Sequence, residues 1–183
     1  METGAKEKIL VDTDIGNDID DMLAIAYLLT HPESELMGVT TVTTQSVKRA
    51  ELVRALLYAA DRKDIPVFPG AERPILIEPY DNHCPHAAAL NKYPHSGVAP
   101  KGEYLSFMRN VIREHPGEIT LLAIGPMTNI GLLLAMDPEL ATLLKRLIIM
   151  CGVFESTPYK SFLEWNAKLD PYGAAMVYRA STS

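Results

Sequence analysis

Short apolar runs and amphipathic stretches alternate along the chain, and this alternation limits the possible folds more than any other feature of the sequence. The runs predict buried strands, and the stretches between them predict helices because apolar residues recur there at helical spacing. We expect strands over 9–11, 36–42, 65–68, 119–124 and 147–151, and helices over 20–29, 46–60, 104–115, 127–136 and 170–178. This order predicts an α/β fold, with a mostly parallel open sheet and helices on both faces.

Two stretches break the alternation and are expected to be loops. Residues 71–102 are rich in proline, histidine, glycine and asparagine and show no periodic pattern. A segment of that length without regular structure is usually a functional loop, a lid or a disordered segment. Residues 152–166 form the second expected loop. A length of 183 residues favours a single domain that comprises residues 1–183.

Composition excludes several classes of function. The chain has 17 Lys+Arg and 23 Asp+Glu, a net charge of -6, and its basic residues are scattered. A surface of that sign repels phosphate backbones, so we expect no nucleic-acid partner. No apolar run approaches the ~20 residues that span a membrane, and the N-terminus lacks the pattern of a signal peptide. Cys84 and Cys151 are far apart, which favours reduced thiols and a cytoplasmic location.

The densest chemistry follows the first expected strand. Five carboxylates stand within ten residues, at Asp12, Asp14, Asp18, Asp20 and Asp21. Ligands of open α/β sheets bind beyond the carboxyl ends of the strands, where these residues are expected to lie. Like charges at this density repel one another unless a cation holds them, and Ca²⁺ and Mg²⁺ prefer oxygen ligands. The run therefore predicts a site for a hard divalent cation.

Two known motifs compete for this run. An EF-hand loop that begins at Asp12 requires glycine at its sixth position and glutamate at its twelfth, where Asn17 and Leu23 stand, so it is rejected. The haloacid dehalogenase-like phosphatases also begin with a strand and Asp-x-Asp, with Asp12 as nucleophile and Asp14 as acid/base. Their pattern expects Thr or Val where this chain has Gly16, so this phosphatase reading is the runner-up.

A third pattern fits better and recurs along the chain. The strings DTDIG at 12–16 and DDMLA at 20–24 resemble the opening signature of the inosine–uridine preferring nucleoside hydrolases. AIGPMTNI at 123–130 and EWN at 164–166, followed by DPYGAA at 170–175, resemble later motifs of that family in family order. The resemblance implies a Rossmann-like nucleoside hydrolase fold. It also implies Ca²⁺-dependent hydrolysis of the N-glycosidic bond of ribonucleosides to ribose and free base, in purine and pyrimidine salvage.

The resemblance also implies metal ligands. Asp14 would bind the metal and take a proton from the attacking water, which makes it the catalytic residue. Asp21 would be the main bidentate ligand, and Thr128 would offer its backbone carbonyl. Asp12 would support the site from behind the ligands. Such a reaction passes through an oxocarbenium-like sugar, whose positive charge nearby carboxylates stabilise.

Further residues are implied to hold the nucleoside. Asp20, Asn166 and Glu164 would hydrogen-bond the ribose. Gln45 stands where family members often carry a ribose-binding asparagine. His83, together with His86 and His95, is a candidate for the nucleobase pocket.

Two further departures from the family pattern qualify these expectations. The spacing from Asp14 to Asp20 is longer than in well-known members, so Asp18 is a further candidate ligand. The chain ends at Ser183, before the family's late His-Asp pair, so we expect a fragment or a natural truncation that lacks the C-terminal segment. A non-catalytic metal- or ribose-binding remnant is therefore the alternative to an enzyme. We also expect self-association into a homo-oligomer, because the lost segment would leave apolar side chains uncovered, namely Leu132, Leu133, Leu147 and Ile149.

Overall fold

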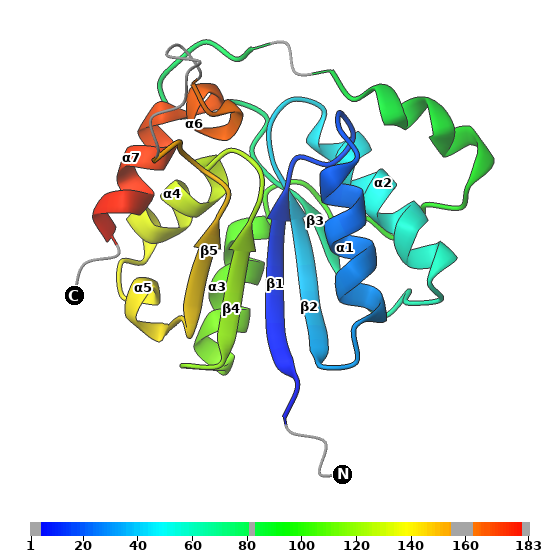
Figure 1. Ribbon diagram of the computed structural model, residues 1–183, viewed down its shortest axis with the longest axis horizontal. Helices are drawn as coiled ribbons and strands as arrows, with labels where there is room; N and C mark the ends of the chain where they lie inside the picture. The colour runs from blue at the N-terminus through cyan, green and yellow to red at the C-terminus, as the bar shows by residue number, and fades with distance from the viewer. Residues whose placement is uncertain (1–4, 81–82, 155–162, 181–183) are drawn as a thin grey trace.

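The protein is built on a five-stranded sheet in which every pair of neighbouring strands is parallel (Figure 1). The computed structural model describes residues 5–80, 83–154 and 163–180. The strand order is β3-β2-β1-β4-β5. The strands are β1 (Glu7–Thr13), β2 (Ser34–Thr41), β3 (Val67–Pro69), β4 (Ile119–Ala123) and β5 (Arg146–Ile149). The predicted parallel open sheet is confirmed.

Helices cover both faces of this sheet, as predicted. Alternate residues of β1 point in opposite directions. Ile9 and Val11 join one buried cluster with side chains from α1 and α2, whereas Leu10 joins a second cluster with α3, α4 and α7. The helices are α1 (Asp20–Thr30), α2 (Ser46–Ala59), the 3₁₀ helix η1 (Pro85–Lys92), α3 (Tyr104–Glu114), α4 (Thr128–Met136), α5 (Leu140–Leu143), α6 (Trp165–Leu169) and α7 (Pro171–Ala180).

The structure differs from the predicted elements in four places. The expected loop 71–102 contains η1, and α5 was not predicted. The third strand pairs with β2 over Val67–Pro69 and not over 65–68. The expected loop 152–166 ends at α6, which begins at Trp165, and residues 155–162 of that loop lie outside the described residues. All these elements are short, so apolar periodicity has too few residues to reveal them.

The apolar side chains expected to lack cover are largely covered. Leu133 is fully buried, and Leu132, Leu147 and Ile149 are partly buried. Ile148 and Met150 point to the opposite face of the sheet, and each is 46% exposed. Figure 1 shows α1 on that face, where the described residues place no helix over β4 and β5. Ile19, which precedes α1, and Leu23 and Tyr27 of α1 are each about 60% exposed. Part of the exposed apolar surface is therefore on the α1 face of the sheet.

Within the part of the chain that the structure describes, no helix has the length and apolar character needed to cross a bilayer.

Candidate active site at the carboxyl edge of the sheet

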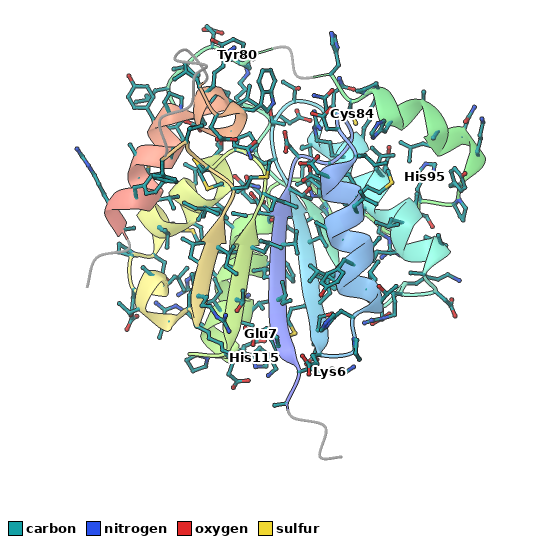
Figure 2. The ribbon with its side chains drawn as sticks, viewed as in Figure 1. Lys6, Glu7, Tyr80, Cys84, His95 and His115 are labelled. Carbon is teal, nitrogen blue, oxygen red and sulfur yellow. The ribbon has the colours of Figure 1, made fainter. Side chains whose placement is uncertain are left out.

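A small hollow of about 90 Å³ lies where the acidic run leaves β1. Four stretches that are separate in the sequence line it, contributing Asp14, Asn17, Asp18, Asp20, Asp21, Ile124, Met150, Glu164, Trp165 and Asn166. In Figure 2, Cys84 marks the carboxyl edge of the sheet, and Glu7 and His115 mark the opposite end. The structure therefore brings together Asp14, Asp20, Asp21, Glu164 and Asn166, as the sequence predicted.

Asp21 is held in place from β1. Only 8% of its surface is exposed, and Thr13 Oγ1 donates a hydrogen bond to its Oδ1. The amide of Ile15 in turn donates to Thr13 Oγ1, at 3.1 Å. Burial, and then the nearby charge of Asp14, raise the pKa of Asp21 to about 7. A carboxylate in this position is destabilised when ionised and would be stabilised by a bound cation.

Asp12 lies near the end of β1, where Asn129 of α4 contacts it. It is fully buried, and its Oδ1 accepts hydrogen bonds from Thr40 Oγ1 and from Asn129 Nδ2, at 2.7 Å from the latter. Its Oδ2 has no hydrogen-bond partner among the described residues. Burial raises the pKa of Asp12 to about 7. Asn129 also donates to Thr41 O at 3.1 Å and accepts from Ala71 N at 2.9 Å. It therefore links β1, β2 and Ala71, contacts that no sequence pattern predicted.

These two raised pKa values predict that the metal-free chain loses stability as the pH rises. Asp12 and Asp21 hold their protons to higher pH in the folded chain than in the unfolded chain, where the carboxyl pKa is near its ordinary value of 3.8. The folded state therefore binds more protons between that value and pH about 7, and the free energy of unfolding falls across this window. We expect a decrease on the order of 3 kcal/mol. Urea titrations in EDTA at pH 5 and pH 8 measure it, with Asp12→Asn as the variant that should flatten the change. A free energy of unfolding that is constant or increases with pH would contradict the expectation.

Glu164 closes one wall of the hollow by capping α6. Its Oε1 accepts from Asn166 N at 3.0 Å, and its Oε2 accepts from Ala167 N at 2.8 Å. Oε2 also accepts from Gly152 N at 3.2 Å, which fixes the chain just after β5. Glu164 therefore has a structural role as an N-cap in addition to the predicted contact with ribose.

Asn166 ties the ends of two strands together. Its Nδ2 donates to Ile124 O at 2.8 Å and to Met150 O at 2.9 Å, and only 3% of the residue is exposed. These carbonyls directly follow β4 and β5. Asn166 therefore fixes the spacing of the wall that it lines, and its predicted role toward ribose stays a prediction.

Thr128 is close to the site but does not line the hollow. It begins α4 and is 2% exposed, and its Oγ1 donates to Asp170 Oδ2 at 2.6 Å. The preceding turn does approach the acidic run, because a Cβ built on Gly125 would lie 2.8 Å from Asp14 N. The predicted metal contact of the Thr128 carbonyl stays a prediction.

Gln45 and His83 do not line the hollow either. Gln45 precedes α2 in a left-handed conformation, with φ of 62°. His83 is exposed, and its carbonyl accepts from Arg49 Nη2 at 3.3 Å. The structure thus connects His83 to the acidic run through the main chain, by way of Arg49.

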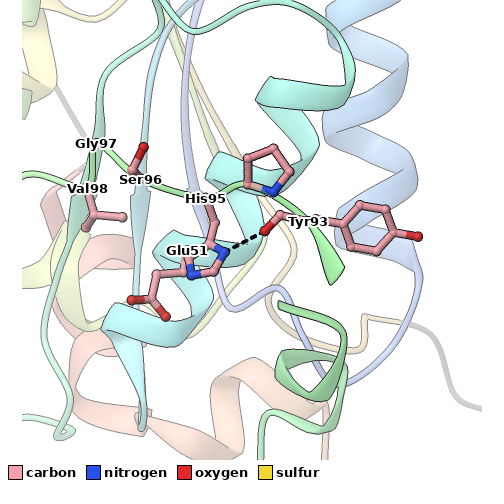
Figure 3. Close-up of a pocket in the computed structure, with 7 residues that line it drawn as sticks. Glu51, Tyr93, His95, Ser96, Gly97 and Val98 are labelled. Atoms are coloured by element: carbon pink, nitrogen blue, oxygen red, sulfur yellow. Dashed lines mark hydrogen bonds between the residues drawn. The ribbon is translucent and has the colours of Figure 1, made fainter. Parts of the chain in front are cut away.

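His95 lies in a separate, wider hollow of about 450 Å³ (Figure 3). This hollow is formed by Glu51 of α2 and residues 93–98. His95 Nδ1 is 2.7 Å from Tyr93 O, within the same short segment. The described structure therefore does not bring His95 into the acidic hollow.

The donor set at the acidic hollow suits Ca²⁺ in kind but forms only part of a coordination sphere. Asp14 and Asp21 are buried carboxylates on one hollow, and Ca²⁺ takes six to eight oxygen ligands. Within residues 5–80, 83–154 and 163–180, no group of three or more His, Cys, Asp or Glu side chains is arranged to hold a metal ion. The volume is also small, since pockets that enclose a small molecule measure ~300–1,000 Å³.

Comparison with known proteins agrees with this geometry. The sequence profile of the inosine-uridine preferring nucleoside hydrolases matches residues 9–183. A pyrimidine-specific ribonucleoside hydrolase of Klebsiella pneumoniae is 33% identical, over 94% of this chain and 57% of its own length. Uridine nucleosidase 1 of Arabidopsis thaliana is 31% identical, over 96% of this chain and 54% of its own length. This chain therefore spans about half the length of these relatives.

Solved structures lead to the same group of proteins. A plant nucleoside hydrolase superposes with a TM-score of 0.79 at 28% identity, covering 95% of this chain and 57% of the plant protein. An inosine-guanosine nucleoside hydrolase superposes with a TM-score of 0.73 at 27% identity, covering 94% and 58%. With the profile match over almost its whole length, this chain belongs to the inosine–uridine preferring nucleoside hydrolase family.

Proposed function

We propose that this chain carries the metal- and ribose-binding part of a ribonucleoside N-ribohydrolase. The proposal depends mainly on one observation: the same hollow is lined by Asp14, Asp20, Asp21, Glu164 and Asn166. Water adds to the anomeric carbon as the C–N bond to the base breaks, so the hydroxyl group ends on ribose and one proton ends on the released base. Asp14 takes the proton of the attacking water, and the surrounding carboxylates stabilise the positive charge that develops on the sugar. Relatives named as ribonucleoside hydrolases and nucleosidases support a ribonucleoside as substrate.

The proposed cofactor is Ca²⁺, held by the carboxylates of Asp14 and Asp21 and by the carbonyl of Thr128. Bound there, the ion would lower the pKa of a coordinated water. The two buried carboxylates support this choice, because oxygen ligands suit a hard cation. Asp18, which is exposed on the same hollow, is a further candidate ligand.

The direct test measures ribose released from uridine and from inosine by the 183-residue chain, with Ca²⁺ and then with EDTA. The proposal expects release that depends on the metal. Ca²⁺ binding without release would support the non-catalytic metal- or ribose-binding alternative. A chain that neither binds Ca²⁺ nor releases ribose would contradict both the enzyme proposal and the non-catalytic alternative. The family match does not support the phosphatase alternative. Hydrolysis of p-nitrophenyl phosphate, measured under the same conditions, provides the control for it.

We further propose that the chain self-associates through the uncovered apolar surface on the α1 face. Ile148 of β5 and Tyr27 of α1 are both exposed on that face, at 46% and 61%. Apolar surface of this kind on a water-soluble protein is commonly covered by a partner.

This proposal predicts that charge on the α1 face favours the monomer. The double variant Ile148→Glu/Tyr27→Glu should shift sedimentation toward the monomer, because ionised side chains resist burial. Leu76→Glu is the matched control, since Leu76 is 71% exposed elsewhere. A wild-type chain that sediments as a monomer at high concentration would contradict the proposal.

The proposed compartment is the cytoplasm, and the proposed role is recovery of free bases from nucleosides. Two cysteines described as free thiols are consistent with a reducing compartment. Separation of cell fractions tests the compartment. Growth on a nucleoside as the sole source of base tests the role.

A further inference from the structure

Arg49 of α2 is the largest fully buried side chain among the described residues. Arginine is almost never completely buried unless its charge and its donors are matched. Periodicity alone places Arg49 on an ordinary amphipathic helix, and no catalytic or ligand-binding role was predicted for it. Its burial therefore requires an explanation from its contacts.

The guanidinium of Arg49 donates to main-chain carbonyls of three separate segments. Nη1 donates to Asp14 O, and to Ile15 O at 3.0 Å. Nε donates to Thr44 O at 2.8 Å, just after β2. Nη2 donates to His83 O at 3.3 Å. Because the fork of donors is planar and rigid, these contacts fix the three segments relative to one another.

The chain just after Asp14 is packed tightly against the same neighbourhood. Gly16 has φ of +123°, and a Cβ built there would lie 2.4 Å from Cys84 Sγ and 2.9 Å from Leu52 Cδ1. The amide of His86 donates to Gly16 O at 3.1 Å. Residues 14–16 therefore lie between α2 and η1, with Arg49 as the polar link.

The charge of Arg49 also suits this position. Burial lowers the pKa of its guanidinium, and the charges of Asp14 and Asp21 act in the opposite direction. Arginine nevertheless stays protonated in proteins. A fixed positive charge thus lies behind the acidic run and reduces the repulsion among its carboxylates.

We propose that Arg49 is a positioning residue for Asp14, holding the main chain of residues 14–15 against α2 and in register with residue 83. Its catalytic consequence rests on the proposed function, whereas the positioning itself does not. A side chain displaced by 1 Å typically costs on the order of 10²-fold in rate. Arg49 therefore acts through Asp14 and need not touch the substrate.

Arg54 provides a matched control on the same helix. It is 5% exposed, and it donates to Ser96 O at 2.9 Å, Lys63 O at 3.3 Å and Ile65 O at 3.0 Å. Both arginines are therefore buried and bound to carbonyls of several segments. Only Arg49 contacts the acidic run.

The experiment compares Arg49→Lys and Arg54→Lys in the 183-residue chain, with Arg49→Met to remove the charge as well. Amide hydrogen exchange without metal should become about 10-fold faster at residues 14–16 in Arg49→Lys, and should stay unchanged there in Arg54→Lys. Ca²⁺ titration should show affinity lower by ~10–100-fold in Arg49→Lys only. Turnover of uridine should fall by ~10–100-fold, with KM changed by less than about threefold. Arg49→Met should show larger losses than Arg49→Lys.

Unchanged exchange at residues 14–16 in a folded Arg49→Lys chain would overturn the proposal. Equal losses of Ca²⁺ affinity in Arg49→Lys and Arg54→Lys would also overturn it, because they would reflect general destabilisation. A wild-type chain that neither binds Ca²⁺ nor releases ribose would refute the proposed function alone. The exchange measurement would then still decide whether Arg49 positions Asp14.

Discussion

Asp14→Asn is expected to lower the rate of ribose release by ~10²–10⁴ relative to the wild-type chain, the usual effect of removing a group that transfers a proton. Asp14 is 8% exposed and lines the acidic hollow, where the proposed function places the attacking water. Asparagine keeps the shape of the side chain but cannot accept the proton. Initial rates with saturating uridine and Ca²⁺ provide the measurement.

Asp18→Asn compares this buried carboxylate with an exposed candidate ligand on the same hollow. Asp18 lines the same hollow but is exposed, so its replacement removes one negative charge without disturbing buried contacts. We expect a smaller loss of rate than in Asp14→Asn, since an exposed charge in water contributes less than a buried one. Equal losses in both variants would show that Asp18 is a ligand or base of comparable importance. An unchanged rate in Asp14→Asn would remove Asp14 from the catalytic role.

The sheet was predictable because its signal is local and repeated. Each long helix carries apolar residues at helical spacing, and α1 and α2 begin at the predicted residues. The 3₁₀ helix η1 was missed because its alanines and Pro85 give no periodic pattern. The short helix α6 was missed because it depends on Glu164 as its N-cap, a contact that extends over only three residues.

The site was predictable where its residues form motifs and was not where they act through the main chain. Asp14, Asp21 and Asn166 converge on the hollow as their motifs implied. Arg49 was missed because its partners are backbone carbonyls of other segments, for which a sequence carries no residue-specific signal. Thr13 belongs to the DTDIG motif, but its hydrogen bond to Asp21 was not predicted. That bond requires the side chains of positions 13 and 21 to meet around the turn.

The sequence prediction named the wrong side chains of β5 as uncovered, for a related reason. Side chains of β5 alternate between the faces, so Leu147 and Ile149 join the cluster with α4 and α7 while Ile148 does not. An apolar run of four residues is compatible with burial on one face or on both. Leu147 and Ile149 are covered because they pack in one cluster with side chains of α4, α5 and α7.

Asp21→Asn should weaken Ca²⁺ binding on the order of 100-fold or more, because it removes a carboxylate proposed to contact the ion directly, whereas supporting residues typically account for ~10–100-fold. Asp21 is positioned for this role by Thr13, whose hydroxyl donates to Oδ1, and asparagine can still accept that hydrogen bond. The loss would therefore reflect the missing charge and not a disordered side chain. Calorimetric titration of the chain with Ca²⁺ at pH 8 measures the affinity.

Asp12→Asn separates a supporting carboxylate from a direct ligand. Asp12 is fully buried, accepts hydrogen bonds from Thr40 and Asn129, and does not line the hollow. Its replacement should weaken Ca²⁺ binding by roughly 10-fold, the effect of a residue that orients the ligands. A larger loss in Asp12→Asn than in Asp21→Asn would reverse the two roles. Equal affinity in Asp21→Asn and wild type would place the ion elsewhere, because a carboxylate that binds Ca²⁺ cannot be neutralised without a loss of affinity.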